Sequence, residues 1–88
     1  MEELKWNSEK NDWLRRTRGV SFEEITQTRL LGIIQNPSRA DQKLMLYELE
    51  DYVWVVPCVK IESGLFLKTM YPSRRYQKLW KNGLLDLS

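Results

Sequence analysis

The stretch that decides the fold is KLMLYELEDYVWVVPCVKIESGLFLKTMY, residues 43–71. Its apolar residues recur with a period of two, which predicts strands at 43–49, 52–61 and 65–71. Only the short steps Glu50-Asp51 and Ser63-Gly64 separate these strands. Steps of this length are typical of hairpins, so the sequence predicts an antiparallel meander.

Helical signals precede the meander. Residues 4–6 can form a short strand or an apolar anchor, and a helix is expected from a cap at Asn7 or Ser8 to about Arg18, closed by Gly19. This helix is the first of two.

The second helix is expected to begin at Ser21, because Ser21 and Glu24 have the spacing of a capping box. It is predicted to end near Gly32, before a loop at 36–38. Glu23 and Glu24 could be read as a catalytic carboxylate pair, but a place in the first turn of a helix gives them a structural reason.

A third helix is predicted over residues 73–82, with Gly83 after its end. Tyr76, Leu79 and Trp80 have the spacing of its buried face. The expected fold is therefore α+β, with two amino-terminal helices, a three- to four-stranded antiparallel sheet and a carboxy-terminal helix in one domain spanning residues 1–88.

The composition narrows the possible chemistry. The chain has 88 residues, 42% of them hydrophobic, one cysteine (Cys58) and no histidine. A single cysteine forms no internal disulfide, which favours the cytoplasm. We expect Cys58 to be packed on its strand. No membrane span is expected. The lack of histidine excludes Ser-His-Asp and Cys-His nucleophiles and an ordinary zinc site, so we expect no metal or cofactor.

Positive charge is concentrated near the end of the chain. The net charge is only +2, yet residues 60–81 hold six basic residues and one acid, Glu62. A basic concentration suits a polyanion such as RNA. An ordinary solvated surface explains the same charges, and both interpretations stay open here.

The loop between the second and third strands decides which face each lysine occupies. A three-residue Glu62-Ser63-Gly64 loop pairs Ile61 with Leu65 and puts Lys60 and Lys68 on one face. A two-residue Ser63-Gly64 turn would place Lys68 in the core, where an unpaired ammonium is costly. We therefore expect the three-residue loop.

The expected register gives the sheet one helix-covered face and one open face. The open face is predicted to carry aromatic, basic and apolar side chains that could stack bases and hold phosphates: Trp54, Lys60, Phe66, Lys68 and Met70. The alternative is that the aromatic residues contact the amino-terminal helices or a partner protein.

Four basic residues on the third helix extend this surface. Arg74, Lys78 and Lys81 form a stripe along the helix, although a stripe is often only a solvated face. Arg74 and Arg75 lie in the first turn, where the helix dipole disfavours positive charge. Positive charge at this unfavourable position therefore favours a binding role, here for phosphate.

Residues 66–75, FLKTMYPSRR, resemble the final strand and following helix of BrnT-like toxins, members of the RelE superfamily. Residues 19–24, GVSFEE, are similar to the HGVSFEEA stretch of that group, and residues 7–10 to its WDxxKN opening. Thr17-Arg18 stands where those sequences carry a Lys-His pair, so their histidine is missing.

The resemblance implies a helix–helix–strand–strand–strand–helix fold, a cognate DNA-binding antitoxin and metal-independent RNA cleavage that inhibits translation. Arg74 matches the family's arginine at the helix start, Arg75 its basic neighbour and Lys68 the basic position of the last strand. Tyr71-Pro72 departs from the Ser-Ala form of many relatives.

RNA cleavage without a metal needs a base, positive charge on the phosphorane and a proton donor. With no histidine, Lys60 or Lys68 is the expected base, since neighbouring cations and partial burial lower a lysine pKa. Arg74 and Arg75 would bind the phosphate, and Tyr71 or Tyr76 would donate a proton or stack a base, with Tyr76 favoured as a core residue. The alternative function is a non-catalytic RNA- or ribosome-binding protein, or an antitoxin-docking module.

Overall fold

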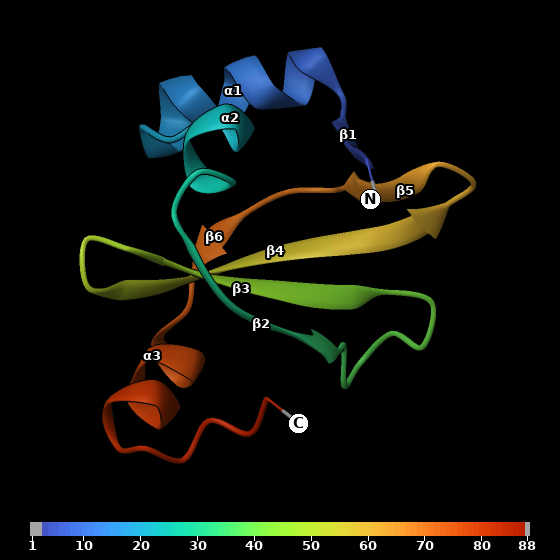
Figure 1. The fold of residues 1–88 in the computed structure, drawn as a ribbon. Helices are drawn as coiled ribbons and strands as arrows, with labels where there is room; N and C mark the ends of the chain where they lie inside the picture. The colour runs from blue at the N-terminus through green and yellow to red at the C-terminus, as the bar shows by residue number, and fades with distance from the viewer. Residues whose placement is uncertain (1–2, 88) are drawn as a thin grey trace.

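The computed structural model describes residues 3–87, which form an α+β fold around a mixed six-stranded sheet (Figure 1). Its strands are β1 (Glu3–Trp6), β2 (Arg29–Gln35), β3 (Lys43–Leu49), β4 (Tyr52–Ile61), β5 (Gly64–Leu67) and β6 (Tyr71–Pro72). Its helices are α1 (Ser8–Arg18), α2 (Phe22–Ile25) and α3 (Arg74–Lys81). The strand order is β1-β5-β4-β3-β2, with β6 paired to β4. Within residues 3–87, no helix has the length and apolar character needed to cross a membrane.

The β3–β4 hairpin has the predicted bounds. Glu50 and Asp51 form its two-residue turn with φ angles of 53° and 61°. Positive φ at both central residues is the backbone of a type I′ turn, whose twist matches that of the paired strands. The prediction of a hairpin at this step is confirmed.

The predicted caps of the first two helices are also confirmed. The Asn7 side chain accepts a 2.9 Å hydrogen bond from the Lys10 backbone N–H at the start of α1. Gly19 ends α1 with a φ of 76°, and Ser21 and Glu24 form both hydrogen bonds of the capping box at the start of α2.

The predicted end of the second helix at Gly32 is wrong, because α2 stops at Ile25 and residues 29–35 form β2. The Thr26 and Thr28 hydroxyls donate to the Phe22 and Ile25 carbonyls at 2.7 and 2.6 Å. Such local bonds compete with a continuing helix. The following residues instead pair antiparallel with β3 and supply it with an outer strand.

The sheet is mixed rather than wholly antiparallel, because β1 pairs parallel to β5. The segment expected to be either a strand or an anchor is therefore a strand. Its Trp6 ring stacks on Phe22 with centroids 5.5 Å apart. This contact ties the outer strand to the α1–α2 layer.

The predicted third strand of the meander is interrupted. Residues 64–67 form β5 and Tyr71–Pro72 forms β6, both beside β4. Between them the Lys68 N–H still donates to the Pro57 carbonyl at 2.8 Å, while the Met70 side chain is fully buried.

Helices cover both faces of the sheet. On the face below α1 and α2, called the helix-pair face, the buried residues are Leu14, Phe22, Ile25, Met45, Tyr47, Val56, Cys58, Leu65, Leu67 and Met70. On the opposite face, called the α3 face, they are Leu44, Leu46, Val53, Val55 and Tyr76. Figure 1 shows the two helical layers on opposite sides of the strands.

The third helix agrees with its prediction. Ser73 caps α3, Tyr76 is buried, and Leu79 and Trp80 pack against the same cluster. The Gln77 side chain accepts from the Val53 N–H at 2.7 Å and donates to the Asp51 carbonyl at 3.1 Å. Gln77 thereby holds α3 against the beginning of β4.

Candidate nucleic-acid interface

The β4–β5 register differs from both registers considered for this hairpin. Ile61 pairs with Gly64 and Lys60 with Leu65, so the connection is the two residues Glu62-Ser63. The predicted pairing of Ile61 with Leu65 is wrong. A slip of one residue moves side chains to the other face.

The position of Gly64 explains the slip. A Cβ atom at this position would collide with the backbone nitrogen and oxygen of Glu3 in β1. Glycine is therefore needed within β5, beside Glu3 of β1, rather than in the loop. The longer loop was expected because burying Lys68 would be costly. The observed register buries neither lysine, since Lys60 and Lys68 are both exposed.

The two lysines do not share a face. Lys60 lies opposite Leu65 on the helix-pair face, whereas Lys68 is aligned with Pro57 on the α3 face. Lys60 is also seven residues along β4 from Val53, whose carbonyl accepts the Ser73 N–H at the start of α3. At about 3.3 Å per residue the separation is roughly 23 Å, so Lys60 and the α3 arginines belong to different sites.

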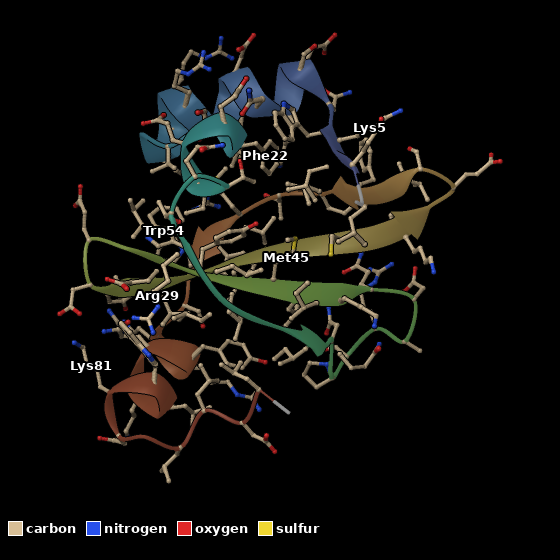
Figure 2. The ribbon with its side chains drawn as sticks, viewed as in Figure 1. Lys5, Phe22, Arg29, Met45, Trp54 and Lys81 are labelled. Atoms are coloured by element: carbon tan, nitrogen blue, oxygen red, sulfur yellow. The ribbon has the colours of Figure 1, made fainter. Side chains whose placement is uncertain are left out.

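The expected open face is also wrong. Trp54 is half-buried against the helix-pair cluster and Met70 is fully buried within it, whereas Phe66 lies half-buried on the α3 face. Trp54 packs against a cluster that includes residues of α1 and α2, which is consistent with the alternative that it contacts the amino-terminal helices. Figure 2 shows Trp54 and Met45 on the upper side of the sheet, with α3 and Lys81 below it.

Three of the candidate residues nevertheless form a row on the α3 face. Phe66 is opposite Val59 and Tyr71 opposite Val55, with Lys68 between them. The Lys68 Nζ lies 5.7 Å from the centroid of the Phe66 ring. An aromatic residue, a cation and a second aromatic residue thus follow one another at steps of about 7 Å along β4. We call this set the Phe66–Lys68–Tyr71 row.

Lys5 adds a second cation to the row. The parallel β1–β5 pairing places it opposite Phe66, so its side chain shares the α3 face. Its ammonium lies 3.5 Å from the Glu3 carboxylate and remains largely exposed. Lys5 was not predicted as a site residue, because no local signal in the sequence predicts the parallel pairing of β1 with β5.

Tyr71 connects the row to α3. It is 36% exposed, and burial raises the pKa of its phenol, with a further contribution from the Tyr76 phenol. The Arg75 guanidinium lies 5.6 Å from the Tyr76 ring centroid. Tyr76, which is buried as expected, therefore lies beside Arg75 and close enough to Tyr71 to contribute to its raised pKa.

The other basic residues of α3 divide into two kinds. Arg74 and Lys78 are exposed and point away from the packed side of the helix. Lys81 instead donates to both carboxylate oxygens of Asp51 at 2.8 Å. This ion pair gives Lys81 a local role in joining α3 to the β3–β4 turn.

The remaining candidates have structural contacts. Cys58 is buried in the helix-pair cluster. Glu24 completes the capping box, and the Glu23 carboxylate accepts a 2.6 Å hydrogen bond from Asn11. Their structural interpretation is supported by these contacts.

The geometry of the α3 face suits binding of a polyanion more directly than proton abstraction. Exposed cations lie beside half-exposed aromatic rings, an arrangement that can hold phosphates and stack bases. A phenol with a raised pKa stays protonated near neutral pH, so Tyr71 can donate a proton but is a poor base there. The partial burial expected to prepare a lysine as base is absent at Lys60 and Lys68.

Comparison with family models, curated proteins and solved structures finds no match to this chain.

Proposed function

We propose that this chain binds RNA on its α3 face and is the toxin of a type II toxin–antitoxin pair, cleaving RNA without a metal and so inhibiting translation. The observation that carries the proposal is the Phe66–Lys68–Tyr71 row, joined to Arg75 through Tyr76. The RelE-like assignment of the fold belongs to the same proposal and is supported by the resemblance of residues 66–75.

RNA binding follows from the kinds of side chain in the row. Lys68 and Lys5 offer positive charge to phosphates on either side of Phe66. Phe66 and Tyr71 offer ring faces, and base–aromatic stacking is largely independent of sequence. Arg74 and Arg75 add guanidinium groups, which bind phosphate through paired hydrogen bonds.

Cleavage is the part that depends on the resemblance. In this proposal the 2′-oxygen attacks the phosphorus and its proton passes to solvent water, while Tyr71 donates a proton to the 5′-oxygen that leaves. Lys68, Arg74 and Arg75 stabilise charge on the phosphorane. Lys60 has no part in this site, because it lies on the opposite face at the far end of β4.

The partner in this proposal is a cognate DNA-binding antitoxin in the cytoplasm. Phe66 and Tyr71 are only partly buried, and an antitoxin seated over them would block access of RNA to the row. Toxin neutralisation would then follow from simple occlusion of the binding face.

The test compares wild-type protein with the Lys68→Ala, Arg75→Ala double variant and with Lys60→Ala as a matched control. Fluorescence anisotropy measures RNA affinity, gel analysis measures cleavage, and growth after induction measures toxicity. We expect the double variant to bind RNA at least about tenfold more weakly and to relieve growth arrest, while Lys60→Ala keeps wild-type affinity and wild-type toxicity. Wild-type protein that neither cleaves RNA nor slows translation in an extract would refute the toxin proposal.

A second candidate is a non-catalytic RNA- or ribosome-binding protein that uses the same face. It is favoured by the exposure of both lysines, which leaves the row without a buried base. Tight, salt-dependent RNA binding with no cleavage products, on free RNA or on translating ribosomes, would select this function.

A further inference from the structure

An open groove of about 490 Å³ lies outside the Phe66–Lys68–Tyr71 row, between the end of α1 and the β3–β4 hairpin. The residues that define it are Arg18, Val20, Glu50, Tyr52, Trp54 and Pro72. Its volume is within the range of sites that hold small molecules. None of the functions assigned to the α3 face uses this groove.

A cation at one wall of the groove is held by an exposed aromatic residue. Trp13 on α1 is 41% exposed, and its ring centroid lies 6.0 Å from the Arg18 guanidinium and 4.4 Å from the Lys10 ammonium. Arg18 therefore contacts Trp13 on one side and lines the groove on the other. The α1 side of the groove is consequently basic.

The opposite wall has a different chemistry. Glu50 comes from the β3–β4 turn and is exposed, while Tyr52 and Trp54 supply aromatic surface from β4. A ligand suited to these groups has a flat ring, an anionic group for Arg18 and a hydrogen-bond donor for Glu50. A nucleotide whose base carries an exocyclic amino group has all three, since a glutamate accepts from the amino group of cytosine.

We propose that the groove holds one amino-bearing base of single-stranded RNA, with its ring against Trp54, its phosphate on Arg18 and its amino group on Glu50. This inference deepens the proposed function and rests on it for the identity of the ligand as RNA. The groove and the Phe66–Lys68–Tyr71 row adjoin each other in the chain and in the sheet. Pro72 lines the groove and pairs with Trp54, and the preceding residue, Tyr71, ends the row. An RNA strand on the row would enter the groove around the edge formed by β6.

The probes are cytidine 5′-monophosphate and uridine 5′-monophosphate, titrated into isotope-labelled full-length protein and followed by NMR. We expect the cytidine nucleotide to shift the Trp54 indole signal and the Arg18 and Glu50 amide signals. The uridine nucleotide lacks the amino group and is expected to bind at least about fivefold more weakly. The Glu50→Gln variant should reduce this preference, because a neutral amide replaces the carboxylate acceptor.

Arg18→Glu should weaken binding of the cytidine nucleotide at least about fivefold by removing the phosphate contact. Arg16→Glu is the matched control, since Arg16 is exposed in the same turn of α1 and does not line the groove. Equal losses in both variants, or nucleotide shifts that avoid Trp54, Arg18 and Glu50, would overturn the inference.

The Lys68→Ala, Arg75→Ala variant separates this inference from the proposed function. It should lose affinity for RNA oligonucleotides while the mononucleotide shifts in the groove persist. Oligonucleotide binding that is unaffected by Arg18→Glu and Glu50→Gln would overturn the groove assignment and leave the proposed function standing. Groove shifts with mononucleotides but no oligonucleotide binding by wild-type protein would refute the proposed function and, with it, RNA as the ligand of the groove.

Discussion

The Phe22 backbone N–H donates a 2.7 Å hydrogen bond to the side-chain carbonyl oxygen of Asn11, which joins the start of α2 to the middle of α1. Asn11 is 4% exposed, so its replacement by alanine leaves a buried amide without this acceptor. We expect Asn11→Ala to lower the free energy of unfolding by about 1–3 kcal/mol, measured by urea denaturation. Asn82→Ala is the control, since Asn82 is exposed and its change should stay within about 0.5 kcal/mol.

The Glu23 carboxylate is the second partner of Asn11 and gives the helix pair a pH dependence. The Asn11 hydrogen bond is the main cause that lowers the pKa of Glu23 below its ordinary value of 4.5, and Arg15 contributes in the same direction. A folded-state pKa below the unfolded value stabilises the protein above the unfolded pKa. This stabilisation is lost as the pH falls through the folded-state pKa.

Glu23→Gln should therefore be less stable than wild type at neutral pH, with a difference that shrinks as the pH falls below about 4.5. Urea denaturation across a pH series measures the difference. Glu62→Gln, a change at an exposed residue of the β4–β5 connection, serves as the control. A stability difference for Glu23→Gln that is constant from neutral to acidic pH would contradict the assigned linkage.

Gly64 is the residue on which the β1–β5 pairing depends. A methyl group there would collide with the Glu3 backbone, so Gly64→Ala should displace β1 and cost about 1–3 kcal/mol. Hydrogen exchange locates the effect, since the amides of β1 and β5 should exchange faster while those of the β3–β4 hairpin change less. Ser63→Ala, next to it and exposed, should leave the exchange pattern unchanged.

Local signals predicted those parts of the fold that local interactions decide. The capping residues Asn7 and Ser21 and the turn at Glu50-Asp51 act within a few residues, and all three were predicted correctly. Residues 29–35 form a strand because they pair with the edge of β3, and this pairing is a tertiary interaction. For this reason the helix pattern was extended too far.

The candidate site likewise combines features that local sequence predicts with features that tertiary contacts decide. Lys68, Arg74 and Arg75 were placed near one another by their closeness in sequence, and the structure keeps Lys68 and the start of α3 on one side of the sheet. Lys60 was added through a register that assumed Gly64 belongs to the loop. The contact between Gly64 and Glu3 sets a different register, and no pattern within the hairpin reveals it.

Tyr71 provides a test that separates RNA binding from RNA cleavage. Burial, with a contribution from Tyr76, raises the pKa of its phenol above the ordinary value of 10.0. In an alkaline titration followed by ultraviolet absorbance, Tyr71→Phe should remove one late-titrating phenol. A second should remain at Tyr47, whose pKa burial also raises.

The same variant keeps the aromatic ring and loses only the hydroxyl. We therefore expect Tyr71→Phe to bind RNA as tightly as wild type and to cleave it about 10²-fold to 10⁴-fold more slowly, the usual contribution of a general acid. Because the protonated phenol is the active form and its pKa is raised, wild-type cleavage should not lose this contribution until the pH exceeds 10. Wild-type rates of cleavage by Tyr71→Phe would exclude the phenol as proton donor, whereas weakened binding would show that its hydroxyl contacts the RNA directly.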